Sequence, residues 1–150
     1  VRSMSLVPAD PPACPEAVQA VAEADWVVLG PGSWFTSVLP HLLVPDLARA
    51  LITTPARRLV TLNLAPQPGE TEGFSPRAHL EVLASHAPDL AIDVVLADKS
   101  AVVQTEGELT DAADLLGARL VLADLALAGR DDRHDPLLLA GALAQIFEGE

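Results

Sequence analysis

The chain has 150 residues, half of them hydrophobic and only 3% aromatic, so it is long enough for one domain with a largely aliphatic core. Its 9 basic and 21 acidic residues give a net charge of −12, which argues against nucleic acid and anionic membranes as partners. The single cysteine, Cys14, excludes an internal disulfide and a multi-cysteine zinc site. No apolar run approaches the roughly 20 residues of a membrane-spanning helix, and the N-terminus has no signal-peptide pattern. These features predict a cytoplasmic protein.

Strand and helix signals alternate along the first half of the chain. Apolar residues recur at helical spacing after Pro15 and again after Pro45, whereas short apolar runs indicate buried strands. The expected elements are a strand at 1–7, a Pro-rich connector at 8–15, a helix at 16–24, a strand at 26–29, a helical stretch at 33–43 interrupted by Pro40, a helix at 46–53 and a strand at 58–64.

The second half continues the alternation after a polar loop at 65–74. Ser75-Pro76 and Asp135-Pro136 each combine a capping side chain with proline at the first helical position, which predicts two helix starts. The expected elements are a helix to about 86, strands at 91–97 and 102–104, a turn at Gly107, a helix at 110–116, a strand at 119–122 and a helix at 137–147. The alternation predicts an α/β layer fold with a largely parallel sheet.

Gly30-Pro31-Gly32-Ser33 follows the first buried strand and precedes a helix start. Glycines there leave room for a ligand, and free N–H groups at the helix start favour an anion such as phosphate. Thr36 and Ser37 add hydroxyl groups. The motif is neither a P-loop nor a Gly-x-Gly-x-x-Gly fingerprint, so a purely structural turn is an equal alternative.

Two further segments carry polar groups. Asn63 and Gln67 follow the second buried strand and have amides suited to a base or sugar, although a rigid surface loop is the simpler reading. Arg133 could clamp a phosphate, or could form a surface ion pair with Asp131 or Asp132. Ligands of parallel sheets bind at the carboxyl ends of strands, where these loops would share one crevice.

Other chemistries lack support in the pattern. The histidines show no metal-ligand spacing, which argues against zinc, and Ser33 has no evident histidine and carboxylate partners for a hydrolase triad. We therefore name no catalytic and no metal-binding residue. Glu70, Asp98 and Asp124 could each reach the crevice, but solvated carboxylates are expected. His134 is expected to be structural or exposed.

Three ordered motifs resemble the YvcK branch of the YvcK/CofD-like proteins, also called the gluconeogenesis factor family. They are the segment 24–45 around Gly30–Ser33, Asn63-Leu64 with Gln67–Phe74, and Arg133–Pro136. The resemblance implies a Rossmann-like three-layer fold and a bacterial protein that binds UDP-sugars such as UDP-N-acetylglucosamine. It also implies a role in cell-wall synthesis and cell shape during gluconeogenic growth.

The resemblance implies a ligand-binding set, with no established catalytic activity or required cofactor for this branch. The set comprises Gly30, Gly32, Ser33, Thr36, Ser37, Asn63, Gln67, Gly69, Glu70, Thr71 and Arg133. The related CofD branch is enzymatic: 2-phospho-L-lactate transferase acts on a deazaflavin and releases a guanine nucleotide. That branch tends to carry Pro-Ser-Asn-Pro where this chain has Gly30–Ser33, which favours the binding branch.

The family's chains are considerably longer and open with a Gly-rich nucleotide loop, so this chain resembles their C-terminal half. We expect the N-terminal half to be a partner in the binding site and a sheet edge to be covered by it or by homo-oligomerisation. A fragment without activity of its own remains a third alternative.

Overall fold

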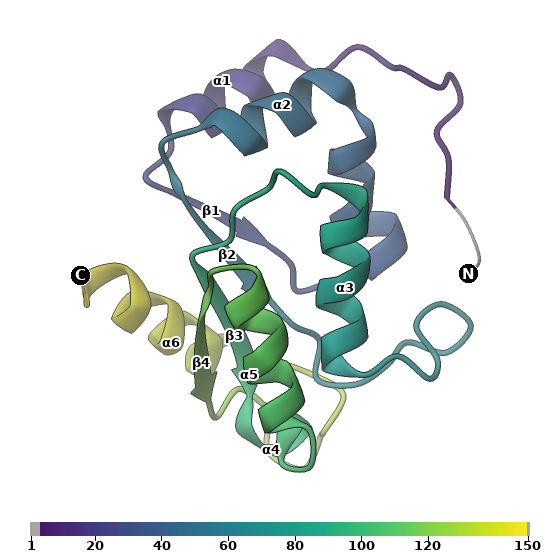
Figure 1. The fold of residues 1–150 in the computed structure, drawn as a ribbon. Coiled ribbons are helices and arrows are strands. Elements are labelled where there is room, and N and C mark those ends of the chain that lie inside the picture. Colours follow the sequence, from purple (N-terminus) through teal and green to yellow (C-terminus); the bar gives the residue numbers. More distant parts are fainter. Residues whose placement is uncertain (1–3, 150) are drawn as a thin grey trace.

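The computed structural model describes residues 4–149 and contains one sheet of four parallel strands (Figure 1). The strand order β1-β2-β3-β4 follows the sequence, so each crossover moves to the next position in the sheet. The strands are Trp26–Leu29 (β1), Arg57–Thr61 (β2), Val94–Asp98 (β3) and Arg119–Ala123 (β4). The predicted α/β fold with a parallel sheet is confirmed.

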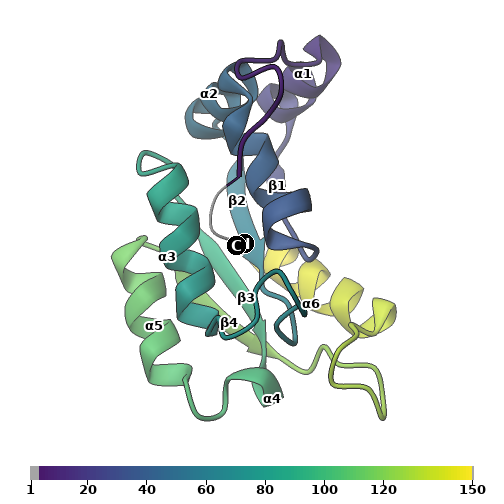
Figure 2. The ribbon, with the colours of Figure 1, turned by 90° about the vertical axis from the view of Figure 1, so that its right-hand side faces the viewer.

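Helices lie on both faces of the sheet and complete a three-layer arrangement. Figure 2 shows α3 and α5 on one side of the strands and α6 on the other, while α1 and α2 lie beyond the amino ends of β1 and β2. The helices are α1 (Pro15–Glu23), the π-helical turn η1 (Trp34–Val38), the 3₁₀ turn η2 (Leu39–Leu43), α2 (Pro45–Thr53), α3 (Pro76–His86), α4 (Lys99–Val102), α5 (Glu106–Leu115) and α6 (Pro136–Glu148).

The strands β2 and β3 are buried on both faces, as their short apolar runs predicted. The same prediction is wrong for β1, which lies at the end of the strand order and leaves Val28 38% exposed. Along β3, Val95 packs into the core beneath α3 and α5, whereas Val94 and Leu96 pack with Ile146 of α6. Alternate side chains of a strand point to opposite faces, so one run of apolar residues serves two cores. Packing on both faces holds these strands in place and thereby sets the positions of the loops that follow them.

Local capping signals place the helix starts where the sequence predicted them. The Ser75 hydroxyl accepts from the Ala78 N–H at 3.1 Å, and the Asp135 carboxylate accepts from the Leu137 N–H at 2.8 Å. Each cap binds an otherwise free N–H of the first turn, and the following proline needs no such partner.

Arg58 ties the end of α2 to β2 although it is almost fully buried. Its guanidinium donates to the backbone carbonyls of Leu51, Ile52 and Thr54 at 2.7, 2.9 and 2.8 Å. These carbonyls lie at the end of a helix, which carries partial negative charge and has no further backbone donors. Arg58, the second residue of β2, therefore binds the free carbonyl groups at the end of α2.

Three predictions fail outright, and some predicted bounds shift: β2 ends at Thr61 and not at 64, β3 begins at Val94 and not at 91, and α5 begins at Glu106 and not at 110. The strand expected at 1–7 falls partly outside the described residues, and 4–7 form no strand. The strand expected at 102–104 is wrong, because Val102 ends α4 and is buried against the core. The turn expected at Gly107 is also wrong, because Gly107 lies in the first turn of α5.

Candidate functional site

The carboxyl ends of all four strands lie together at one end of the sheet, its carboxyl edge, because the strands are parallel. The loops that leave this edge are 30–33, 62–75 and 124–135, and α4 begins there directly after β3. The three polar motifs singled out in the sequence are therefore on the same side of the sheet. This is where α/β sheets bind ligands.

The Gly30–Ser33 turn requires glycine at its first position. Gly30 has a φ of 81°, and a Cβ there would lie 2.6 Å from the Thr61 carbonyl oxygen at the end of β2. Any other residue would suffer both the left-handed backbone and this clash. The absence of a Cβ at Gly30 therefore allows the turn to lie against the end of β2.

Asn63 fastens the same turn to the start of the second loop. Its side-chain Oδ1 accepts from the Gly32 N–H at 3.0 Å, and its Nδ2 donates to the Gly32 carbonyl at 2.8 Å. Both polar groups of the Asn63 amide are thus occupied by the protein's own backbone. A contact between Asn63 and a base or sugar stays a prediction that would use this amide's remaining hydrogen-bonding capacity.

Glu70 binds the donors at the start of η1. Its Oε1 accepts from the Phe35 N–H at 2.9 Å and from the Ser33 hydroxyl. Ser33 also caps the turn by accepting from the Thr36 N–H at 3.1 Å. The position expected to attract an anion therefore already holds a carboxylate of the chain itself. The free N–H groups at the start of a helix carry partial positive charge, which favours a carboxylate there. Glu70 links loop 62–75 to the Gly30–Ser33 turn.

Loop 62–75 is held in shape by a buried threonine. Thr71 is fully buried, its hydroxyl accepts from the Gln67 N–H at 2.8 Å, and its own N–H donates to the Gln67 carbonyl at 3.0 Å. Gly69, with a φ of 74°, makes the tight turn between them. The Gln67 side-chain oxygen is buried without a hydrogen-bond partner. Thr71 thus supports the loop, and Gln67 retains an unused acceptor.

The remaining predicted site residues lie at the surface of the same edge. Thr36 and Ser37 are exposed on η1, and Arg133 is exposed in the loop that follows β4. Asp132, one of the two ion-pair partners considered for Arg133, is bound by Arg130 through two hydrogen bonds of 2.8 Å. Whether any of these residues binds a ligand stays a prediction.

Asp98 is the buried acidic group of this edge, where a solvated carboxylate was expected. It is 4% exposed and accepts from the N–H groups of Ser100, Leu125 and Ala126 at 2.8, 2.7 and 3.1 Å. Burial raises the pKa of Asp98, but hydrogen bonds from Ser100, Leu125 and Ala101 outweigh it and leave the pKa lowered. Asp98 therefore joins the start of α4 to the loop after β4.

His134, which was expected to be structural or exposed, is partly buried and lies close enough to Asp98 to feel its charge. Burial lowers the pKa of His134, while the Asp98 charge and a hydrogen bond to the Leu62 backbone act in the opposite direction. Its Nε2 is buried without a partner. The nearby Asp-Lys-Ser sequence at 98–100 is an Asx-type cap that could have pointed to Asp98. The influence of Asp98 on His134 acts between segments too far apart in sequence to be predicted from local patterns.

A cavity of about 230 Å³ opens between loop 62–75, α3 and α4. Its lining includes Leu62, Asn63, Phe74, His79, Ala101 and Thr105. Of the predicted site residues, Asn63 borders this cavity. The cavity is therefore next to the Gly30–Ser33 turn, because Asn63 also holds Gly32.

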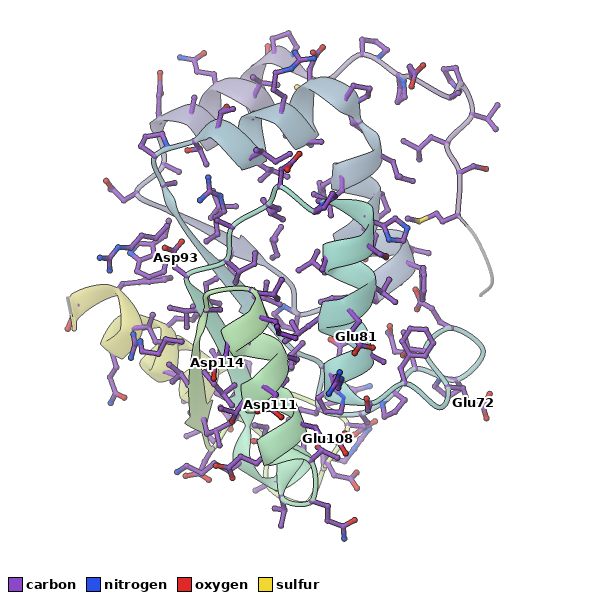
Figure 3. All side chains as sticks on the ribbon, in the orientation of Figure 1. Glu72, Glu81, Asp93, Glu108, Asp111 and Asp114 are labelled. Atoms are coloured by element: carbon purple, nitrogen blue, oxygen red, sulfur yellow. The ribbon has the colours of Figure 1, made fainter. Side chains whose placement is uncertain are left out.

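Charge around the fold is predominantly negative. Figure 3 labels Glu81 on α3 and Glu108, Asp111 and Asp114 on α5, which make the outer face of this helix pair acidic. Arg77 binds Glu81 at 2.6 Å, and this bond, with the charges of Glu81, Glu108 and Asp111, raises the pKa of Arg77. Such a field opposes anionic ligands at long range, so a phosphate needs local donors.

Within residues 4–149, no group of three or more His, Cys, Asp or Glu side chains is placed to hold a metal ion. Over the same residues, no single helix is long and apolar enough to cross a membrane. The helical segments Trp34–Leu43 and Pro45–Thr53 together have the required length and hydropathy, but their axes are bent by 86° relative to each other.

Comparison with known proteins assigns the family. A family model described as "2-phospho-L-lactate transferase CofD" matches residues 1–130. The chain belongs to the CofD family. Relatives named "Putative gluconeogenesis factor" are 50% identical in Mycobacterium leprae and 48% identical in Mycobacterium tuberculosis, each over 99% of this chain. The chain spans 42% and 43% of those relatives and corresponds to their C-terminal part.

A crystal structure from the same family supports the Rossmann-like fold. A Bacillus halodurans protein superposes with a TM-score of 0.80 at 28% sequence identity, covering 96% of this chain and 50% of that one. The CofD-family chain described here is thus similar to about half of a longer chain. The resemblance to gluconeogenesis factors read from the three motifs is confirmed.

Proposed function

We propose that this chain is part of a regulatory protein that binds a nucleotide-sugar of the UDP-N-acetylglucosamine type. The arrangement that carries the proposal is the pair of loops at the ends of β1 and β2, joined by Asn63 to Gly32 and by Glu70 to Ser33. Pre-formed loops cost less ordering on binding, so they suit a ligand contact better than free surface loops do.

In this proposal the Gly30–Ser33 turn meets the phosphates and the Gln67–Thr71 loop meets base or sugar. The turn already stabilises the Glu70 carboxylate through the Phe35 N–H and the Ser33 hydroxyl. A diphosphate would compete with Glu70 for these donors, while the exposed Arg133 would clamp it from the loop after β4. The proposed biological role couples gluconeogenic carbon metabolism to cell-wall synthesis and cell shape, and the names of the relatives support its gluconeogenic part.

Isothermal titration calorimetry tests the proposal. UDP-N-acetylglucosamine is titrated into the natural full-length protein and, separately, into the 150-residue chain. Saturable heat with the full-length protein supports it, and Ser33→Ala should weaken binding whereas the exposed Ser85→Ala on α3 should not. No binding at millimolar ligand would overturn it. A ligand-induced rise in melting temperature seen only for the full-length protein would show that this chain is an incomplete site.

A transferase is the second candidate, because the matching family model is itself described as 2-phospho-L-lactate transferase. This function predicts a preference for guanine nucleotides, dependence on a divalent metal and product formation with a deazaflavin acceptor. Absence of turnover with the full-length protein, beside an active control enzyme, would remove this candidate.

A further inference from the structure

The two faces of the sheet are covered to different extents. On one face, side chains of η1, η2, α3 and α5 join the larger core, whereas α6 is the helix that packs on the other face (Figure 2). There Leu139, Leu143 and Ile146 of α6 contact the side chains of the strands. Parallel sheets have both faces buried in the proteins that contain them, so we expect this second face to need more cover than one helix.

The strand β1 shows where this cover is incomplete. Trp26 and Val28 are two positions apart, so their side chains point to the same face, and Trp26 contacts Phe147 of α6 with 5.0 Å between ring centroids. Val28 therefore points to the α6 side, yet it is 38% exposed. Within residues 4–149, β1 pairs with β2 alone, so its outer edge has backbone groups that no strand binds.

The outward side of α6 is apolar as well. A helix at a protein surface normally carries charged residues on its outward side, and a helix that is apolar all round is normally buried all round. Charged residues make up 20% of the chain, but none lies between Asp135 and Glu148. Leu137 is 83% exposed, Leu138 is 44% exposed, and Ala144 is exposed one turn or more further along. The sequence of α6 is therefore that of a buried helix.

These exposed positions form one apolar surface, which we call the α6 face and define as Val28, Leu137, Leu138 and Phe147. Leu137 lies where α6 begins, after the loop that leaves the carboxyl edge, and Phe147 lies beside Trp26 at the amino end of β1. The α6 face thus runs along the length of the sheet. Apolar surface without charged residues is typical of the centre of a protein interface.

The length of the relatives indicates what covers the α6 face. The mycobacterial relatives continue on the N-terminal side of the part that this chain matches, and the matched part is less than half of each. A segment in the same polypeptide is held at high effective concentration, which favours its contact with an apolar face. A second copy of the chain is less suited, because it would bring one net charge of −12 against another.

We propose that the α6 face is the interface with the N-terminal part of the natural full-length protein. An apolar surface of that part would cover Leu137 and Leu138 on the outward side of α6, and a strand or helix beside β1 would cover Val28 and the outer edge of the strand. This interface does not depend on the identity of the ligand, so it goes beyond the proposed function.

Thiol accessibility in the natural full-length protein tests this interface. Leu137→Cys is compared with Leu115→Cys on α5, because the two leucines are 83% and 82% exposed in the structure. Each variant is treated with iodoacetamide, and the peptide that contains position 137 or 115 is quantified by mass spectrometry, so that other cysteines do not interfere. We expect position 137 to react more slowly than position 115 in the folded protein, by about tenfold or more, and at the same rate in urea.

Two outcomes would overturn the proposal. Equal rates at the two positions in the folded protein would mean that the α6 face is open to solvent. Protection of position 137 that rises with protein concentration would mean that a second copy covers it, and not the N-terminal part. Melting curves establish whether the variants fold. Leu138→Cys gives a second position on the α6 face, where we expect the same protection even if Leu137→Cys does not fold.

Discussion

The side-chain amide of Asn63 bonds both the N–H and the carbonyl of Gly32, as the backbone of a neighbouring strand would do. The two residues exchange a pair of hydrogen bonds, with the Gly32 N–H donating at 3.0 Å and the Asn63 Nδ2 donating at 2.8 Å. The Gly30–Ser33 turn, beyond the end of β1, is thereby held to the chain that leaves β2. Asn63 is primarily the residue that sets the shape of the candidate site, and any ligand contact would be added to this role.

Asn63→Asp should destabilise the protein because the substitution removes the donor and places a carboxylate oxygen against the Gly32 carbonyl. We expect the free energy of unfolding to fall by about 1–3 kcal/mol, measured by urea denaturation at pH 7. Gln19→Glu is the matched amide-to-acid control on the exposed surface of α1, where Gln19 only bonds Glu23. A loss no larger than that of the control would contradict the structural role of Asn63.

Gly30→Ala and Gly141→Ala should have opposite effects. The Gly30 Cβ would lie 2.6 Å from the Thr61 carbonyl oxygen at a φ of 81°, so we expect a loss of about 3 kcal/mol or more, or no folding. Gly141 lies within α6 with nothing within 4 Å of a Cβ, so alanine should stabilise the protein by about 0.5–1 kcal/mol. Thermal unfolding of both variants compares them, and a tolerated Gly30→Ala would show that the turn can move away from β2.

Sequence reasoning located the elements whose signals are local. Ser75-Pro76 and Asp135-Pro136 contain a cap and a proline in adjacent positions, and both start helices in the structure. The strand predicted at 102–104 was wrong because its signal was too short. Three residues cannot distinguish an apolar strand from the end of a short helix.

The candidate site was predictable only in part. The sequence placed Gly30–Ser33 and Gln67–Thr71 at neighbouring strand ends, and parallel topology brings them together. It could not show that Glu70 binds Ser33 across 37 positions, or that Asp98 binds Leu125 across 27. Such contacts depend on the packing of the whole sheet, so the burial of Asp98 was not predicted.

Asp98 should make stability depend on pH in the acid range. Its pKa is lower in the folded protein than in the unfolded chain, because backbone and Ser100 hydrogen bonds to the carboxylate outweigh burial. The stabilisation is therefore complete above the unfolded pKa, near 3.8, and is lost as the pH falls through the folded value. Asp98→Asn should lower stability at pH 7 and flatten the decline below about pH 4, in urea titrations repeated across pH. Asp124→Asn, at an exposed ion pair with Lys99, should retain the decline.

Glu70→Gln tests whether the turn that binds this carboxylate can also bind a phosphate. The neutral amide is a weaker acceptor for the Phe35 N–H and the Ser33 hydroxyl, so the unliganded protein should lose about 1–2 kcal/mol of stability. Removing the charge also removes the competitor of a diphosphate at these donors. We therefore expect UDP-N-acetylglucosamine to bind the full-length variant more tightly, by up to about tenfold, or 1.4 kcal/mol.

Glu72→Gln provides the control for this change, because it alters the net charge equally from an exposed position in the same loop (Figure 3). Calorimetry on both variants separates a local effect from the overall charge. An equal increase in affinity for the two variants would mean that only the overall negative charge of the protein affects binding. Weaker binding by Glu70→Gln would instead mean that the Glu70 carboxylate contacts the ligand directly, for example through a sugar hydroxyl. The phosphates would then have to bind at a part of the carboxyl edge other than the start of η1.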